Sequence, residues 1–302
     1  MNELQELSKQ YQAPDGARIF YKLITRPDSN YTLVMLHGMA SNHTRWTEFI
    51  SYSRLIQSMN FLRLDLRGHA NSMVFGHRIG HVIWKRDLHE ILNLESLNRV
   101  ILLGHSMGAQ LALHYALTYP EQVMGVVLID PTLPGELKGQ LSLARRLHYP
   151  LWIAIQLLRL LTKINPLKKA YSVCDLHELD IKTRKLMTSQ SVDVLVELYS
   201  SPKEDLKFLP FVNYLQDVYA VTSALPDISA IRCPIHLLLS RASSIVKPEN
   251  VVKYFPVQNP PEVTYIDANH WPLTEKPDDI RDAIDTWCRK LITAEQNKNS
   301  SV

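Results

Sequence analysis

The feature that most constrains the fold is a serine flanked by two glycines, placed between a strand pattern and a helix pattern. The apolar run Val100–Leu103 predicts a buried strand, and Ala109–Tyr119 follows helical spacing. Between them stands Gly104-His105-Ser106-Met107-Gly108, a G-x-S-x-G motif. In such a turn the central residue has strained backbone, and small residues two places to either side avoid clashes. The motif predicts a sharp strand-to-helix turn that presents the Ser106 hydroxyl at the carboxyl end of a strand.

The rest of the chain alternates strand and helix patterns, with one long interruption. Strands are predicted at residues 31–36, 61–64, 123–129, 235–239 and 263–266, and Pro14-Asp15-Gly16 predicts a hairpin near the start. Strands that alternate with helices favour a parallel sheet covered on both faces. The pattern over 131–225 is helical throughout. We therefore expect a core of 1–130 and 226–302, a helical cap over 131–225, and a disordered polar tail over 294–302.

Composition and charge exclude several functional classes. Among 302 residues, 33 are Lys or Arg and 30 are Asp or Glu, and a net charge of +3 is too weak to imply nucleic acid as a partner. The three cysteines form no CxxC pair, and the amino-terminal segment has no apolar signal sequence, so we expect a cytoplasmic protein. We expect no metal, because no metal motif fits the spacing of four histidines, His69, His77, His81 and His89.

Four motifs, which stand in the order expected of the family, make the chain similar to the α/β-hydrolase superfamily over about 11–130 and 226–293. One is the G-x-S-x-G turn, and the others are His37-Gly38-Met39, the loop Asp65–Ser72, and the stretch Asn269–Pro277 with its His-Trp-Pro sequence. The resemblance implies a mostly parallel eight-stranded sheet with helices on both faces and an inserted helical cap. It implies that no cofactor is needed.

The resemblance also implies site residues. Ser106 would be the nucleophile, and His270 would be the general base and then the general acid. The backbone N–H groups of Met39 and Met107 would form the oxyanion hole. His270 follows the serine in the chain, as the order Ser, Asp or Glu, His requires.

The acidic partner of the histidine departs from the family pattern. Where the family places an aspartate after its seventh strand, this chain has Ser243, and Ser240 replaces a glycine. The substitute is Asp130, at the end of the predicted strand 123–129. A Ser–His dyad and an acid elsewhere in the chain stay open. Of the other polar residues in the motifs, His37 and His105 are expected to be structural, and Asp65 and Arg67 to form an ion pair that braces their loop.

These features predict a serine hydrolase for carboxylic esters. The apolar segment Leu151–Leu161 is expected to be a cap helix over a pocket, which favours a small-molecule ester with an apolar acyl group. Flanking cations such as Arg145 and Arg159 leave weak membrane-surface contact through the cap as a further possibility. Thioesterase, amidase and C–C hydrolase chemistry stay open, as does a ligand-binding protein with decayed catalysis. The sequence leaves the natural substrate, the pathway and the oligomeric state undetermined.

Overall fold

The computed structural model describes residues 5–137, 139–164, 171–187, 199, 201–243 and 247–299. Its centre is one eight-stranded sheet in the order β1-β2-β4-β3-β5-β6-β7-β8. Strand β2 pairs antiparallel with both β1 and β4, and every other neighbouring pair is parallel. The strands are β1 (Leu7–Gln12), β2 (Arg18–Ile24), β3 (Thr32–Leu36), β4 (Asn60–Leu64), β5 (Val100–His105), β6 (Val123–Ile129), β7 (Ile235–Ser240) and β8 (Glu262–Ile266). The predicted mostly parallel fold is confirmed.

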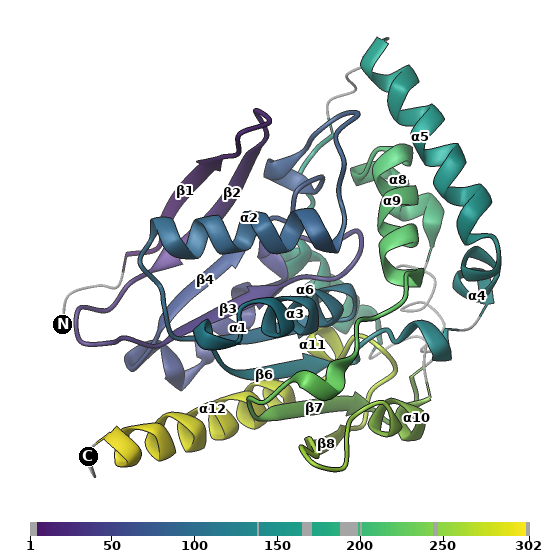
Figure 1. Cartoon of the computed structure of the whole chain (residues 1–302). Coiled ribbons are helices and arrows are strands. Elements are labelled where there is room, and N and C mark those ends of the chain that lie inside the picture. Colours follow the sequence, from purple (N-terminus) through teal and green to yellow (C-terminus); the bar gives the residue numbers. More distant parts are fainter. Residues whose placement is uncertain are drawn as a thin grey trace.

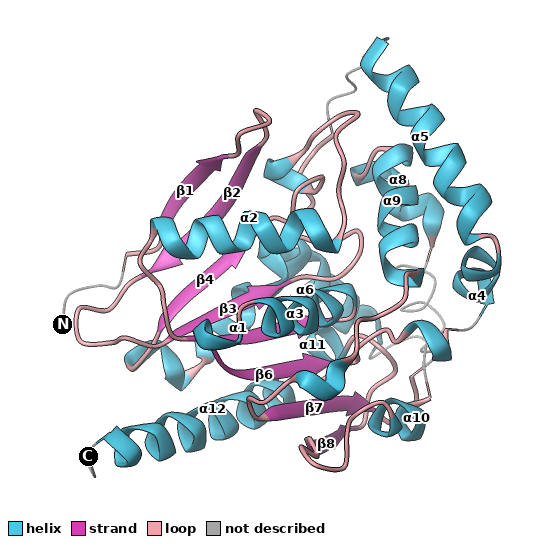
Figure 2. Cartoon of the chain, in the orientation of Figure 1, coloured by secondary structure: helices cyan, strands magenta, loops and turns pink. Residues whose placement is uncertain are grey.

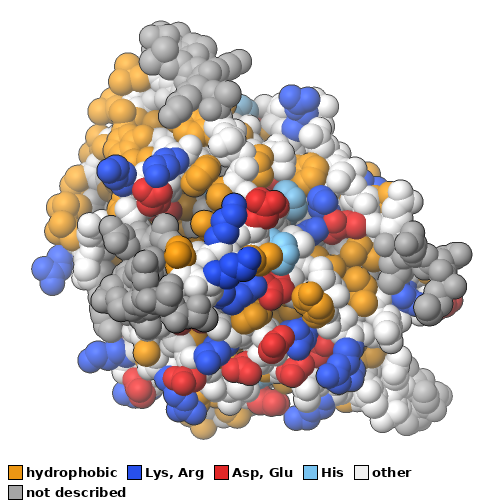
Figure 3. Space-filling view, turned by 180° about the vertical axis from the view of Figure 1, so that it is seen from behind, with side chains coloured by type: hydrophobic (Ala, Val, Ile, Leu, Met, Phe, Trp, Pro, Cys, Tyr) orange, Lys and Arg blue, Asp and Glu red, His pale blue; other side chains and the backbone are white. Residues whose placement is uncertain are grey.

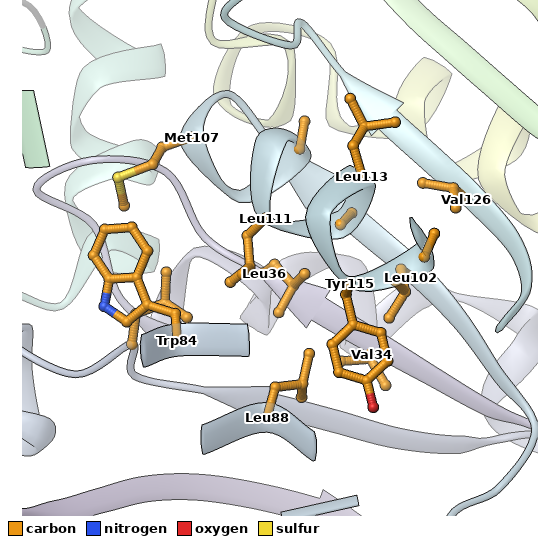
Figure 4. Packing of buried hydrophobic residues seen from close by; sticks show 14 of the residues in the cluster. Val34, Leu36, Trp84, Leu88, Leu102, Met107, Leu111, Leu113, Tyr115 and Val126 are labelled. Carbon is orange, nitrogen blue, oxygen red and sulfur yellow. The ribbon is translucent and has the colours of Figure 1, made fainter. Parts of the chain in front are cut away.

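Helices cover both faces of the sheet, as Figure 2 shows. The helices are α1 (Thr47–Tyr52), α2 (His81–Leu94), α3 (Met107–Thr118), α10 (Pro248–Lys253), α11 (Pro272–Glu275) and α12 (Pro277–Asn299). Alternate residues of a strand point to opposite faces. Accordingly Val34 and Leu36 of β3 join the core under α2 and α3, whereas Leu33 and Met35 join the core under α1 and α12. Figure 4 shows the first of these cores, with Met107 beside Trp84.

Between β6 and β7 the described chain holds only helices. They are α4 (Gly139–Arg146), α5 (His148–Ile164), α6 (Leu176–Met187), α8 (Pro202–Phe208) and α9 (Phe211–Thr222). Helices α4 and α5 are separated at Leu147, and α8 and α9 are separated before Phe211, because Pro210 cannot continue a helix. In Figure 1, α4, α5, α8 and α9 form a group beyond the ends of β6 and β7. None of the described helices is long and apolar enough to cross a membrane.

Helix α9 connects this helical group to the core through polar side chains. The Asn213 amide donates to two backbone carbonyl oxygens of the loop 65–80, at 3.0 Å each. Gln216 bonds to a backbone N–H and a carbonyl oxygen of the same loop. Asp217 lies 2.9 Å from Nε2 of His69, and both side chains are buried. Since α4 and α5 pack against α9, this docking positions the whole helical group.

The expected disordered tail is wrong for residues 294–299, where α12 continues to Asn299. The segment contains no glycine or proline that would end the helix. One anchor is long-range, because Glu295 forms a 2.6 Å ion pair with Arg99. Residues 300–302 lie outside the described residues.

The expected ion pair between Asp65 and Arg67 is also wrong. Asp65 instead accepts hydrogen bonds from the N–H and Nδ1 of His43, the second at 2.7 Å. Arg67 forms two hydrogen bonds with the carboxylate of Asp87 and another with Asp15. Both residues do brace the loop. Asp65 also accepts hydrogen bonds from the N–H and the side-chain amide of Asn71 within it, whereas the partners of Arg67 lie farther along the chain.

Candidate active site

Ser106 stands at the turn between β5 and α3 with the strained backbone that the motif predicts. Its φ is 54° and its ψ is −112°, a region that side chains rarely adopt. The two flanking glycines make this turn possible. A Cβ on Gly104 would overlap the Gly108 carbonyl, and a Cβ on Gly108 would overlap the carbonyl oxygen of Leu36. The close approach of β3, β5 and α3 therefore fixes the position of Ser106.

His270 lies in the loop after β8, which the carboxylate of Glu275 holds in shape. Glu275 accepts hydrogen bonds from the N–H groups of Asn269 and Trp271. The His270 side chain is almost fully buried, and its Nε2 has no hydrogen-bond partner among the described residues. Burial, with a smaller contribution from His105, holds the pKa of His270 well below its usual value. A neutral imidazole with an unpaired Nε2 is suited to accept a proton.

Asp130 follows β6 directly and points toward the other nitrogen of this imidazole. One carboxylate oxygen lies 3.7 Å from Nδ1 of His270. The same carboxylate accepts a hydrogen bond from the Ser240 N–H at 2.7 Å and another from the Ser240 hydroxyl at 2.5 Å. Burial raises the pKa of Asp130 to about 7, repulsion from Glu275 adds to the rise, and the Ser240 hydrogen bonds oppose it.

Ser243, at the family's usual acid position, also reaches the imidazole. Its hydroxyl oxygen lies 3.4 Å from Nδ1 of His270. The structure therefore brings Asp130, the predicted acid, and Ser243, the residue at the family's usual acid position, to one nitrogen. Sequence analysis missed the part that Ser240 has in holding the carboxylate. The sequence signal for this contact was the position of Ser240 at the end of β7. Using it requires knowing that β7 lies beside β6, which depends on the strand order.

The loop after β3 places Met39 beside the serine turn. His37 anchors the loop, since its Nε2 accepts a hydrogen bond from the Leu66 N–H and its Nδ1 donates to the Gly38 carbonyl oxygen. A Cβ on Gly38 would lie 3.4 Å from the Cβ of Ser106, so the loop packs directly against the serine. His37 is thus structural, as expected.

Met107 is the first residue of α3, and its side chain is buried in the core beside Trp84 (Figure 4). No acceptor among the described residues bonds to the backbone N–H of Met39 or Met107. Two free N–H groups flank Ser106, one of them at the positive end of a helix. That end of a helix favours negative charge.

A cavity of about 880 Å³ opens over Ser106 and His270. Its lining comes from the loop after β3, from the serine turn, and from α4, α5, α6, α8 and α9. Most of the lining side chains are apolar, among them Leu141, Leu147, Leu151, Leu179, Phe208, Leu215 and Val218. Glu204 and Asp205 also belong to the lining, and Glu204 is paired with Lys207 at 2.5 Å. Burial and repulsion from neighbouring carboxylates raise the pKa of Asp205 to about 7.

The model of the alpha/beta hydrolase family matches residues 33–283. The chain belongs to this family. The match includes the turn at Ser106, Asp130 and His270, together with all the helices between β6 and β7.

The curated relatives of this alpha/beta hydrolase resemble it mainly over short stretches. A Bacillus subtilis protein that bears the name of a 2-succinyl-6-hydroxy-2,4-cyclohexadiene-1-carboxylate synthase is 36% identical over 114 residues, which is 36% of this chain and 39% of that protein. Human epoxide hydrolase 4 is 23% identical over 274 residues, covering 85% of this chain and 72% of that protein. The chain thus spans about two fifths of the first curated relative.

Solved structures match over nearly the whole chain. A hydrolase from Pseudomonas aeruginosa has a TM-score of 0.66 at 16% identity, covering 93% of this chain and 98% of that one. A thermophilic esterase from Thermogutta terrifontis has a TM-score of 0.63 at 19% identity, covering 95% of this chain and 99% of that one. At this identity the likeness shows the fold alone.

The hydrolase also contains a buried ion pair that sequence analysis missed. Arg45, which lines the cavity, lies 2.5 Å from both carboxylate oxygens of Asp180 on α6. The Tyr199 hydroxyl donates to the same carboxylate at 2.6 Å. Asp180 is 135 residues away in sequence, so no local pattern pairs the two. The pair neutralises Arg45, the single Lys or Arg among the described residues that line the cavity.

Proposed function

We propose that this chain is a serine hydrolase that cleaves carboxylic esters with an apolar acyl group through an acyl-enzyme. The observation that carries the proposal is the site itself. A serine on a strained turn and a buried histidine with an unpaired Nε2 line one largely apolar cavity. Residues 131–225 act in this proposal as the cap that supplies most of the cavity wall.

The chemistry follows from the positions of the groups. The Ser106 oxygen attacks the acyl carbon, and Nε2 of His270 takes the hydroxyl proton. The N–H groups of Met39 and Met107 donate to the oxygen that gains negative charge. The same proton then passes to the leaving alcohol oxygen as the ester bond breaks. Water, deprotonated by the same nitrogen, next attacks the acyl carbon of the acyl-enzyme. The imidazolium returns that proton to the Ser106 oxygen as the acyl–serine bond breaks, and the acid is released. Asp130 balances the charge of the imidazolium in both halves.

The lining of the cavity favours a neutral, apolar acyl group over an anionic one. Among the described residues that line the cavity, Arg45 is the single Lys or Arg, and it is already paired with Asp180. A substrate carboxylate would find no unpaired Lys or Arg on this wall, so its transfer from water would cost free energy. This argues against transfer of the synthase chemistry named for the Bacillus relative, whose product name includes a carboxylate and a succinyl group.

Labelling with a fluorophosphonate probe tests the nucleophile. The wild-type chain should be labelled, and Ser106→Ala should lose both the label and at least about a thousandfold in ester hydrolysis. Ser41→Ala is the matched control, because Ser41 lines the same cavity and its label should stay. An unlabelled wild-type chain would favour the alternative of a ligand-binding protein with decayed catalysis.

A panel of p-nitrophenyl esters tests the acyl preference. Each additional buried CH₂ contributes about 0.8 kcal/mol, so lengthening butyrate to octanoate should raise kcat/KM by up to about two hundredfold. The hemisuccinate is the matched partner of butyrate, because it has the same number of acyl carbons and a carboxylate in place of the terminal methyl group. It should be the poorer substrate. A preference for hemisuccinate or acetate would contradict the apolar pocket.

A further inference from the structure

Helix α5 exposes a continuous row of apolar side chains. The row is Tyr149, Trp152, Ile153, Leu157, Leu160 and Leu161, with exposed fractions from 39% to 71%. Their spacing of three or four residues places them on one side of the helix. Figure 3 shows hydrophobic side chains gathered along the upper left edge, where α5 of Figure 1 lies when it is seen from behind. An exposed apolar row of this length marks an interaction surface.

The first turns of α5 also reach the cavity. Pro150, Leu151 and Ala154 line it, and Pro150 and Ala154 are themselves exposed, so the exposed surface of α5 adjoins the proposed acyl site. Two leucines before the helix belong to both surfaces. Leu143 and Leu147 line the cavity and are 57% and 49% exposed. The exposed row therefore continues into the cavity wall at this end of the helix.

Charge and aromatic content indicate the kind of partner. Residues 139–164 contain the cations Arg145, Arg146, Arg159 and Lys163 and no Asp or Glu. Tyr149 and Trp152 stack with ring centroids 6.2 Å apart on the exposed side. Two of the cations, Arg145 and Arg159, also donate to backbone carbonyl oxygens of the chain. An exposed apolar row that includes aromatic side chains, in a segment whose charges are all positive, is typical of helices that lie in the interface of an anionic lipid surface.

We propose that the exposed row of α5 docks on an anionic lipid surface, from which a lipid ester enters the cavity past Leu143 and Leu147. The entry step rests on the proposed ester hydrolysis, but the docking step does not. Sequence analysis left membrane-surface contact through the cap open because of the cations in this segment, and the structure adds the exposed apolar row on α5.

Vesicle sedimentation with Ser106→Ala tests docking without turnover. The vesicles are phosphatidylcholine with an equal part of phosphatidylglycerol, and phosphatidylcholine alone is the comparison. Leu157→Ser and Leu161→Ser should each weaken binding to the anionic vesicles by about tenfold, because each removes apolar groups from the lipid. Leu94→Ser is the matched control, since Leu94 is 61% exposed, as Leu161 is, but lies on α2. It should bind as the parent does.

The same substitutions made in the active chain, with Ser106 present, separate lipid docking from ester hydrolysis. The assay is hydrolysis of a soluble short-chain ester. Leu157→Ser and Leu161→Ser should keep this activity and lose hydrolysis of the ester presented in vesicles. Loss of both activities, or equal weakening by Leu94→Ser, would overturn the docking surface. So would equal binding to both vesicle types. A dimer that Leu157→Ser converts to a monomer, without vesicle binding, would assign the row to a second copy of the chain instead.

Discussion

The charge on Asp130 offers the most direct test of the proposed mechanism. Asp130→Asn keeps the size of the side chain and an oxygen that can accept the Ser240 N–H, which now lies 2.7 Å from the carboxylate. It removes the negative charge beside the imidazolium that forms when His270 takes the serine proton. The change therefore isolates charge balance from packing.

The geometry sets the size of the effect. At the 3.7 Å between Oδ2 of Asp130 and Nδ1 of His270, opposite unit charges attract by about 4.5 kcal/mol at an effective dielectric constant of about 20. At about 1.36 kcal/mol for each factor of ten, kcat should fall by roughly a thousandfold. Loss of the charge on a triad acid in a serine protease gives a fall of about 10⁴, which is similar in scale.

Steady-state hydrolysis of a p-nitrophenyl ester measures this fall, and thermal unfolding at pH 8 is the control. Because burial raises the pKa of Asp130 to about 7, its ionised form lowers the stability of the folded wild-type chain at pH 8. The Asp130→Asn variant should therefore have a Tm no lower than that of the wild type. A fall in kcat smaller than tenfold, together with a larger fall for Ser243→Ala, would refute Asp130 as the acid and favour a Ser–His dyad. Rescue of Asp130→Asn by Ser243→Asp would show that the family's usual acid position still reaches His270.

Two other predictions follow from the same site. The proposed mechanism needs Asp130 ionised, and its pKa is raised to about 7 while that of His270 is lowered, so kcat should fall as the pH drops through about 7. Ser240→Ala removes a hydrogen bond that opposes the rise in the pKa of Asp130, so the pH at which kcat falls should move upward. If this pH is unchanged in Ser240→Ala, the assignment of Asp130 as the acid is contradicted. Gly108→Ala should lower the free energy of unfolding, measured in urea, by more than about 3 kcal/mol, because its Cβ would overlap backbone atoms. Gly16→Ala should lower it by only about 1–2 kcal/mol, because Gly16 has a φ of 83° but open space around it. Equal losses for the two variants would contradict the packing argument.

Local patterns predicted the elements well, because they depend on short-range periodicity. The strand 123–129 and the turn at Ser106 are at the predicted residues. The same patterns contain no information on partners far along the chain. Arg67 binds Asp87 and Asp15 rather than nearby Asp65, and Glu295 near the end of α12 pairs with Arg99. Both wrong expectations involve ion pairs with residues far along the chain, which no local pattern contains.

The candidate site shows a similar division. Ser106, His270 and Asp130 could be placed near one another, since each follows a strand whose carboxyl end meets the same edge of the sheet. The contact between Ser240 and Asp130 could not be predicted, because it depends on β6 and β7 being neighbours in the sheet. The Arg45–Asp180 pair depends on how α6 packs against the core, for which the sequence has no local signal.

The docking of α9 has a consequence for protein engineering. Its side chains Asn213, Gln216 and Asp217 satisfy backbone groups of the loop 65–80 and the buried His69. A set of cap helices transplanted from another hydrolase would leave those groups without partners, at a cost of about 1–3 kcal/mol for each buried group. Helix α9 and the loop 65–80 should therefore be transferred together. Substrate range is best altered on α4, because α5 also bonds to this loop, through Arg159 and the carbonyl oxygens of Gly76 and His77.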